Sequence, residues 1–513
     1  MTYVFDDLYA KSLKNQKFTN LLEIIQMEEN IKLAYRNMRK NSGGRTPGID
    51  NLTINHINSI CEDEFLRIVK SKMRNYHPKR VRRVEIPKVN GEMRPLGIPT
   101  IWDRIIQQCF LQVLEPICEA KFFERSNGFR PNRSVENSIA QSYKMMQMYK
   151  LHYVVDVDIK GFFDNVNHGK LLKQLWAIGI RDKRVIAMIS KMLKAEVVMP
   201  DKSIVKSEKG ILKKRLNLEI SEDKSKITNL RKEYSEFLGF KMKVYQKGDK
   251  WKVKSHMCDK AYDRTRKELK EAMDVIKDTE GSANTGRAIS IYNAKVIGIH
   301  QYFQLATMIS EDVSKISYEI QHKCKSRKLE RRIEQTGRTK QGYIEKIYGA
   351  SKQLRYINEV AIAPIGYCKH KNPMYKKKKV NKYTPEGREL IYKNISVSQT
   401  AIQYMLNNPI ENRSIEYNDN RISLYVGQQG KCAVTGNVLD FYNMHCHHKI
   451  PRKMGGTDEY NNLVIVEREV HTLIHAVDEE VIAKLLGKLS LDKKKLAKLN
   501  TLRTKSGNKA INW

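Results

Sequence analysis

The hydrophobic pattern changes period along the chain, and each change predicts a different kind of element. Residues 1–75 carry apolar positions at helical spacing, as in KFTNLLEIIQMEENIKLAYRNMRK. Residues 79–98 alternate instead, which predicts two short strands around a turn at Asn90-Gly91. Two further helices are expected at about 101–122 and 134–149.

The middle of the chain predicts one strand region and then a long helical region. LHYVVDVDI (151–159), which ends at the turn KGFFDNVNH, predicts a buried strand. Helices are expected to about residue 195, and strand character returns at 225–244. From about 258 to 358 the pattern is helical throughout, as in KAYDRTRKELKEAM. With 513 residues and roughly 100–200 residues per domain, the chain is expected to be an α+β multidomain protein.

The net charge of the chain indicates which kind of molecule it binds. The chain has 94 Lys and Arg against 57 Asp and Glu, a formal net charge of +37. That excess indicates a polyanion, with nucleic acid as the first candidate and a membrane surface as the alternative. Residues 321–380 hold 17 basic and four acidic residues, whereas residues 421–480 hold six and eight. The shift predicts a domain boundary near 380–420.

Membrane and secreted classes are not expected. The first residues, MTYVFDDLYAKS, lack the apolar run of a signal peptide, and no stretch reaches the roughly 18 apolar residues of a membrane span. The eight cysteines are scattered and include no C-x-x-C pair, which favours a reducing compartment. We therefore expect no membrane partner and a cytoplasmic location, in the bacterial cytoplasm or at the nucleoid rather than in an organelle.

A histidine cluster near the C-terminus is the first candidate site. His471 and His475 are four residues apart and share one side of a predicted helix, and His447 would join them from a strand. Three neutral imidazoles suit a divalent cation such as Zn or Ni, and tolerate Mg or Mn when phosphate and water complete the shell. Three protein ligands leave an open position, which is typical of a catalytic site. A structural zinc site and a chance surface cluster are the alternatives.

Two further residues complete this candidate site. His448 follows His447, and successive strand residues point to opposite faces, so His448 is placed to take a proton from an attacking water. Asn462 can fix the loop or orient that base through its amide. Cys432 and Cys446 lack paired neighbours and are expected to be small buried apolar residues rather than ligands of a second zinc.

The segment CAVTGNVLDFYNMHCHHKIPRKMGGTDEYNNLVIVEREVHTLIH (432–475) resembles the HNH nuclease motif. The shared features are His-His, Pro, Gly-Gly, Asn-Leu and a final histidine pair. The resemblance implies a ββα-metal fold and a metal-dependent DNA endonuclease. It also implies that His448 is the general base and that the metal ligands are His447, His471 and His475.

Carboxylates mark a second candidate site. Asp156 and Asp158 alternate along VVDVDI and so face one side of the strand, where a carboxylate can bind Mg²⁺. Phe163 could lie over a nucleotide sugar, and Lys88 and Arg94 flank a hairpin that could reach a triphosphate. The alternative for a strand-end aspartate is a cap or an ion pair.

Several blocks taken in order resemble a group II intron-encoded reverse transcriptase. They are TPGIDN, RRVEIPKVNGEMRPLGIPTIWDRIIQQ, FERSNGFRPNRSVENSI, VDVDIKGFFDNVNH, LNLEISEDKSKITN and EFLGFK, and IYNAKVIGIHQYFQLAT is similar to the maturase (thumb) region. The resemblance implies right-hand polymerase-like fingers and palm, an all-helical thumb/maturase domain, and roles in intron splicing and homing. It also implies Asp158 as the first catalytic carboxylate, Lys88 and Arg94 as nucleotide contacts and Phe163 as the sugar-sensing residue.

The chain departs from that family in the palm. The Pro-Gln-Gly-Gly and Tyr-x-Asp-Asp blocks are missing, and VVMPDKSIVKSEKG runs straight into ILKKRLNLEISEDKSKITN around Gly210–Ile211. Two-metal phosphoryl transfer needs carboxylates from more than one strand. The sequence therefore predicts a truncated palm without polymerase activity, which would bind Mg only if the Asp158 site were complete.

These observations predict six segments and a mobile-element function. The segments are fingers (1–150), truncated palm (151–250), thumb/maturase (251–380), linker and DNA-binding region (381–425), HNH endonuclease (426–480) and basic C-terminal helix or tail (481–513). The first interpretation is a protein that binds intron RNA as a ribonucleoprotein and nicks target double-stranded DNA. The alternatives are a nuclease that the first 380 residues only deliver, a decayed element, and a non-enzymatic splicing cofactor. The resemblance leaves a homodimer open.

Aromatic residues in the maturase region and the basic end of the chain are further candidates for nucleic-acid contact. Tyr292, Tyr302 and Phe303 lie among basic residues and could stack on RNA bases, with core packing as the alternative. The last thirty residues could contact DNA or form a solvated helix face.

Overall fold

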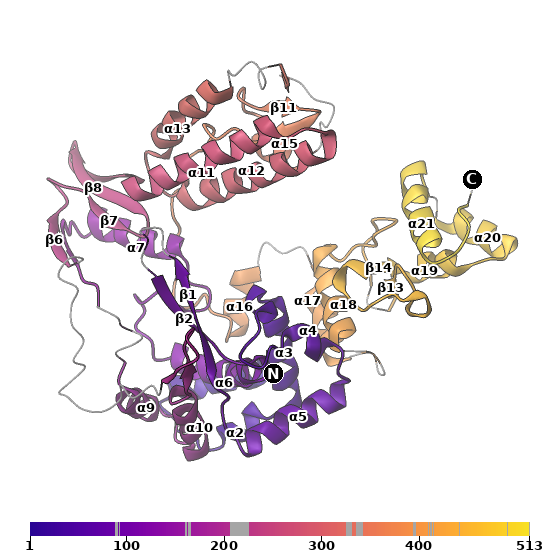
Figure 1. Cartoon of the computed structure of the whole chain (residues 1–513), viewed down its shortest axis with the longest axis horizontal. Helices are drawn as coiled ribbons and strands as arrows, with labels where there is room; N and C mark the ends of the chain where they lie inside the picture. Colours follow the sequence, from indigo (N-terminus) through magenta and orange to yellow (C-terminus); the bar gives the residue numbers. More distant parts are fainter. Residues whose placement is uncertain are drawn as a thin grey trace. The chain divides into compact units, whose positions relative to one another are not determined.

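The computed structural model is a mixed α/β structure (Figure 1). Its residues form two compact units. It describes residues 1–87, 91, 93–159, 162, 166–205, 225–324, 331–334, 342–392, 397–408, 410, 413, 415–440, 442–489 and 491–511. The first unit is Met1–Phe122, Val166–Lys213 and Lys382–Trp513, and the second is Phe123–Asn165 and Lys214–Asn381. Both units combine several of the six predicted segments, whose boundaries stay a prediction.

The N-terminal part of the first unit is a helical layer with a small sheet. Its helices are α1 (Thr2–Leu13), α2 (Leu21–Ile25), α3 (Glu28–Lys40), α4 (Ile54–Asn58), α5 (Glu62–Arg74), α6 (Ile101–Glu119), α9 (His168–Ala177) and α10 (Lys183–Leu193), with a 3-10 turn η1 (Ser42–Arg45). Its strands are β1 (Val81–Pro87), β2 (Met93–Ile98), β4 (Val197–Val198) and β5 (Ile204–Val205), in the order β2-β1-β4-β5. The helices predicted over residues 1–75 and the strand pair at 79–98 are therefore present.

Amphipathic spacing and capping explain these helices. In α3, Ile31, Ala34, Tyr35 and Met38 recur at intervals of three and four and are all buried. The helix α6 begins at a Thr100 cap, whose side-chain oxygen accepts a hydrogen bond from the backbone N–H of Asp103. Each of the two helices has one apolar face, and the apolar faces of α3 and α6 pack against each other in one core.

The C-terminal part of the first unit has its own core. Its elements are α16 (Pro385–Tyr392), α17 (Gln399–Asn407), α18 (Ile415–Gly427), β13 (Met444–His448), η3 (Arg452–Met454), η4 (Tyr460–Asn462), β14 (Leu463–Glu467), α19 (Arg468–His475), α20 (Glu479–Leu489) and α21 (Lys493–Lys505). Residues predicted as a linker (381–425) thus hold three helices, and Ala401 and Tyr417 are buried in this core. The predicted basic tail also contributes to it, through Leu499 and Leu502 of α21.

The second unit packs a β-meander against helices. Its helices are α7 (Val135–Gln147), α11 (Asp259–Asp278), α12 (Ser282–Phe303), α13 (Ile309–Cys324) and α15 (Tyr343–Tyr348). Its strands are β3 (Tyr153–Asp156), β6 (Lys226–Asn229), β7 (Ser235–Phe237), β8 (Phe240–Lys247), β9 (Lys250–Met257), β10 (Ile333–Glu334), β11 (Arg355–Ile357) and β12 (Val360–Ile362). The helices α11 and α12 lie side by side (Figure 1), and their apolar faces share one core with β8 and β9.

The prediction that residues 258–358 are helical throughout is wrong, and so is the all-helical thumb. The strands β11 and β12 form an antiparallel hairpin, with β10 on the other side of β11. Asn358 and Glu359 have φ of 48° and 66° in the connecting turn. A two-residue turn in which both residues have positive φ matches the right-handed twist of the strands that it connects, so it favours a hairpin here. The strand region before this helical region also continues past residue 244, because β9 ends at Met257.

The predicted buried strand at 151–159 is shorter and more exposed than expected. The strand β3 covers Tyr153–Asp156 and pairs only with β6 among the described strands. Val155 is 64% exposed, and Tyr153 and Val157 are exposed as well. An apolar run predicts burial only if other elements cover both faces of the strand, and in the described chain one face of β3 is open.

Within the described residues, no helix combines the length and the apolar character needed to cross a bilayer.

Candidate metal centre

Three histidines converge on a strand–strand–helix arrangement in the first unit. The strands β13 and β14 are antiparallel, with His447 opposite Val464, and α19 begins directly after β14. A nitrogen atom from each of His447, His471 and His475 lies within 4.8 Å of the others. His447 is buried, His471 is half-buried and His475 is exposed. The group therefore has one side toward the protein and one side toward solvent.

Burial keeps these imidazoles neutral. Desolvation, together with a smaller effect of the neighbouring histidines, lowers the pKa of His447 to about 3 and that of His471 to about 4. The pKa of His475 is lowered as well, mainly by burial. A neutral imidazole has a free lone pair and can bind a divalent cation. The structure thus brings the three predicted ligands together, and their role as ligands stays a prediction.

Two neighbours hold the rings of this group in place. The Oγ atom of Ser506 lies 3.3 Å from Nε2 of His447. The ring of His445 stacks on that of His471, with centroids 4.6 Å apart. His445 lies two positions before His447 on β13 and so shares its face. Neither neighbour was among the predicted site residues.

His448 points away from the histidine group, as the alternation along a strand predicts. Its Nε2 lies 2.7 Å from Oδ1 of Asp458, whose side chain is almost fully buried. Its ring stacks on Tyr417, with centroids 5.3 Å apart and planes 18° apart. Sequence reasoning missed Asp458 and Tyr417. The carboxylate just after Gly-Gly in the same loop was the available signal for Asp458.

Asn462 fixes the loop that carries Asp458. Its Nδ2 donates to the carbonyl oxygens of Ile450 and Thr457, and its Oδ1 accepts from the backbone N–H of Ile450. These hydrogen bonds fit the first of the two roles expected for Asn462, which is to hold the loop, and its part in catalysis stays a prediction. Gly456 is required in the same loop, because a Cβ there would overlap the carbonyl oxygen of Ile450.

A chain of polar contacts links this loop to the N-terminal helices of the first unit. The amide of Asn420 donates to the backbone carbonyl of Asp458 at 2.7 Å. The guanidinium of Arg39 on α3 donates to Oδ1 of Asn420 and pairs with Glu416, each at 2.9 Å. A polar cavity of about 880 Å³ lies beside these residues, and Asn58, Arg413, Arg452 and Asp458 are among those that line it. The loop of the candidate base therefore borders an open, polar hollow.

The two cysteines near the site are buried free thiols. Burial raises the pKa of Cys446 to about 12, and Cys432 is buried in the same core. The carbonyl of Cys446 accepts a hydrogen bond from the hydroxyl of Tyr417 at 2.8 Å. In the described chain, the histidines are the one group that could bind a metal through three ligands.

The carboxylates of the second candidate site lie on β3 and just beyond it. Asp156 accepts a hydrogen bond from Ser235 at 3.0 Å, and the backbone N–H of Asp158 donates to Ser225 at 3.2 Å. Arg94 is exposed on β2 opposite Ile86, and it belongs to the first unit whereas the aspartates belong to the second. Lys88 and Phe163 lie outside the described residues, as does the Gly210–Ile211 junction.

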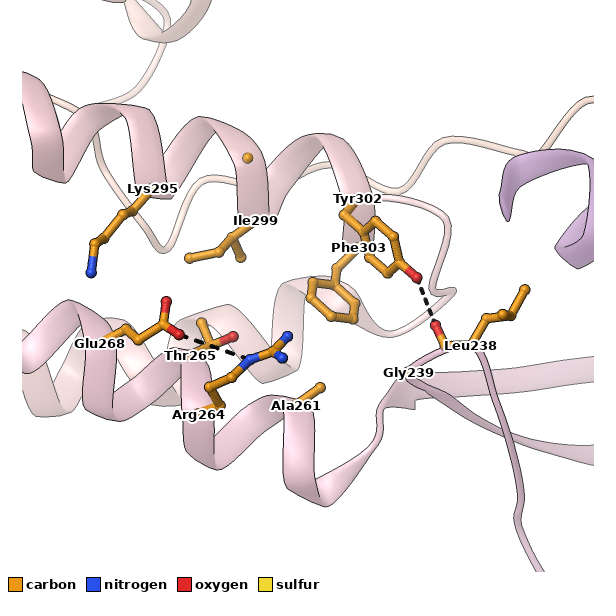
Figure 2. Close-up of a pocket in the computed structure, with 11 residues that line it drawn as sticks. Leu238, Gly239, Ala261, Arg264, Thr265, Glu268, Lys295, Ile299, Tyr302 and Phe303 are labelled. Carbon is orange, nitrogen blue, oxygen red and sulfur yellow. Dashed lines mark hydrogen bonds and ion pairs between the residues drawn. The ribbon is translucent and has the colours of Figure 1, made fainter. Parts of the chain in front are cut away.

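The aromatic residues proposed for base stacking are mostly core residues. Tyr292 and Phe303 are buried, which favours the core-packing alternative. Tyr302 is 38% exposed, and its hydroxyl donates to the carbonyl of Leu238 at 2.9 Å (Figure 2). A cavity of about 510 Å³ lies between α11 and α12 beside Tyr302, with Arg264, Glu268 and Lys295 along it (Figure 2).

Comparison with known proteins identifies one part of the chain. Residues 86–212 match the family described as "Reverse transcriptase (RNA-dependent DNA polymerase)". The chain therefore carries a reverse-transcriptase domain, which confirms that part of the resemblance.

Three relatives match part of the chain, and the names of two of them refer to introns. The chain is 36% identical over 183 residues to "Group II intron-encoded protein LtrA" of Lactococcus lactis subsp. cremoris, covering 35% of this chain and 30% of that protein. It is 35% identical over 193 residues to "Protein YkfC" of Escherichia coli (strain K12), covering 36% and 50%. It is 34% identical over 113 residues to "Nuclear intron maturase 2, mitochondrial" of Arabidopsis thaliana, covering 22% and 15%. Each match spans half or less of the relative's length.

Proposed function

We propose that this chain is a group II intron-encoded protein that binds intron RNA and nicks double-stranded DNA at the histidine group. The RNA-binding part rests on the reverse-transcriptase domain, on relatives named as intron-encoded proteins and maturases, and on the net charge of +37. The nicking part rests on the histidine group. The two parts have different support and are tested separately.

The observation that carries the nuclease proposal is the arrangement of four histidines. His447, His471 and His475 meet within 4.8 Å, whereas His448 leaves β13 on the other face and contacts Asp458. The three converging residues would hold a divalent cation such as Mg, Mn, Zn or Ni, and a bound cation would stabilise charge on the leaving oxygen of the scissile phosphate. This arrangement supports the proposal because it agrees with the resemblance of the sequence to the HNH motif.

The remaining chemistry falls to residues of the chain. Oδ1 of Asp458 would accept a hydrogen bond from the N–H group at Nε2 of a neutral His448, which leaves the lone pair of the ring on Nδ1. That nitrogen would take the proton of the attacking water. Asn462 and Gly456 would keep the loop closed, so that Asp458 stays within reach of His448.

We infer further that the chain does not polymerise DNA. Asp156 and Asp158 supply carboxylates from one strand, and two-metal chemistry needs more than one. The reverse-transcriptase match ends at residue 212, next to the junction where the family's further blocks are missing. The open face of β3 in the described chain supports a palm that lacks strands.

The deciding experiment is plasmid nicking by the purified full-length chain. We expect supercoiled DNA to become nicked circles with Mg²⁺ or Mn²⁺ and to stay intact with a chelator. His448→Ala should slow nicking at least ~100-fold, because it removes the general base. His77→Ala, at an exposed histidine of the same unit, is the matched control and should keep the rate. Nicking that survives His448→Ala would contradict the proposal.

A splicing cofactor without nuclease activity is the second candidate, which the relative named as an intron maturase favours. It predicts that the chain binds a group II intron RNA and raises the fraction spliced, with no nicking in any metal. A decayed element predicts neither activity. Splicing and nicking assays on one preparation therefore separate the three interpretations.

A further inference from the structure

The hairpin of β8 and β9 in the second unit has two chemically different faces. The strands pair along their full length, from Phe240 opposite Met257 to Lys247 opposite Lys250. One face is apolar and is part of the core. Its buried residues are Phe240, Met242, Val244, Val253 and Met257.

The opposite face is a ladder of lysines. Residues two apart on a strand share a face, so the cross-strand pairs Lys243–Lys254, Tyr245–Lys252 and Lys247–Lys250 lie in a row on one side. We call Lys243, Tyr245, Lys247, Lys250, Lys252 and Lys254 the lysine face. Tyr245, Lys247, Lys250 and Lys252 are exposed, and the other two are half-buried. The row places five positive charges on one side of a single hairpin.

These charges are not balanced inside the described chain. Like charges directly opposite one another destabilise an antiparallel pair. In the part of the chain that the structure describes, none of the five lysines forms an ion pair with a carboxylate, whereas Lys241 at the end of the same row pairs with Asp259. Lys243 instead lies 5.8 Å from the ring of Tyr234. The hairpin therefore carries a repulsion that a polyanion would relieve.

We propose that the lysine face binds the phosphodiester backbone of a nucleic-acid strand. Two residues along a strand advance roughly 6.6–6.8 Å, so the ammonium groups stand at regular intervals that suit a chain of regularly spaced phosphates. Tyr245 stands among them with an exposed ring that can stack on a base. The inference rests on the RNA-binding part of the proposed function and assigns it a surface outside the helical region.

Protection of a sheet edge is the competing explanation. The sheet order is β7-β8-β9, so β9 is an edge strand, and lysines on edge strands prevent pairing with other chains. That explanation predicts that the chain self-associates when the lysines are replaced and that its affinity for nucleic acid does not change. The two explanations therefore differ in a measurable outcome.

The test uses the full-length chain, a fluorescent 20-nucleotide RNA and a DNA strand of the same sequence. The lysine-face variant is K250Q/K252Q/K254Q, and the matched control is K14Q/K17Q/K40Q, which removes the same charge from exposed lysines of the first unit. We expect the lysine-face variant to bind RNA at least ~10-fold more weakly near 0.1 M salt, and its slope of log K against log salt to fall by about 2, since each contact on a single strand contributes about 0.7. The control should change less.

The outcomes separate this inference from the proposed function. If the two variants bind RNA and DNA with equal affinity, the lysine face is not the binding surface, although the chain still binds RNA. Self-association of the lysine-face variant in light scattering would then favour edge protection. A wild-type chain that binds neither strand nor a group II intron RNA would overturn the RNA-binding function itself. Weaker binding of both strands would assign the face to the phosphate backbone, and a loss for one strand alone would assign it to that nucleic acid. A circular dichroism spectrum and a melting temperature equal to those of the wild-type chain show that the substitutions leave the fold intact.

Discussion

The histidine group and the aspartate strand differ in how much of the chain each one needs. His447, His471 and His475 come from β13 and α19, which β14 connects within one short segment. Asp156 and Asp158 lie on β3 and just past its end, and the other carboxylates of a two-metal site would have to come from strands far away in the sequence. A site encoded in one segment depends only on local folding. A site shared between distant strands is lost when one strand is lost.

The largest expected effect concerns the cation. His471→Ala removes one of three imidazoles, and we expect it to weaken Mn²⁺ or Zn²⁺ binding at least ~100-fold, because removal of even an outer-shell partner costs 10–100-fold. Isothermal titration of the full chain with the metal alone measures this, and His77→Ala is the control. An unchanged affinity for the metal would show that the histidine group is a surface cluster without a bound cation. The contrast between the histidine group and the aspartate strand would then fail.

A smaller effect is expected for the carboxylate beside His448. Asp458→Asn keeps the size of the side chain but removes its charge, so it should lower kcat for nicking by roughly 10–100-fold and leave KM unchanged. Metal affinity should stay within about twofold, because Asp458 is not in the histidine group. A parallel fall in metal affinity would instead mean that Asp458 only supports the loop. This variant sharpens the comparison, since it tests a residue from the same segment.

No effect is expected at the aspartate strand. Primer extension on an RNA template with dNTPs and Mg²⁺ should give no product from either the wild-type chain or Asp158→Ala, and Asp158→Ala should nick DNA at the wild-type rate. A product that disappears in Asp158→Ala would mean that other carboxylates complete the site. The palm would then be functional, and the contrast between the two sites would fail.

The parts of the fold that were predicted are those that periodicity controls. The helices of residues 1–75 and the convergence of His471 and His475 follow from intervals of three and four residues, and the separation of His448 from His447 follows from strand alternation. No element was predicted for residues 245–257, which include β9, although the alternation of lysines with apolar residues along β9 has the period of a strand. The hairpin of β11 and β12 was missed because strands of three residues are too short to show a period.

The remaining features depend on contacts that no pattern in the sequence encodes. Asp458 reaches His448 only because Asn462 and Gly456 close the loop between them. Val155 is exposed because β3 has one described partner strand, and the composition of a strand does not specify what covers it. The convergence of the three histidines was therefore predictable, whereas burial and loop closure required the structure.

The polar chain from Arg39 to Asp458 limits how far the C-terminal region with the histidine group can be treated as a separate module. Arg39 lies on the third helix of the protein, more than 370 residues before Glu416 and Asn420, yet it bonds to both. A fragment that starts after residue 396 would keep His448 and the histidine group but would lose this guanidinium. Asn420 would still donate to the backbone carbonyl of Asp458, but its own side chain would lose the hydrogen bond from Arg39. Transfer of the histidine group to another protein would therefore require α3, or an arginine in its place, to be transferred as well.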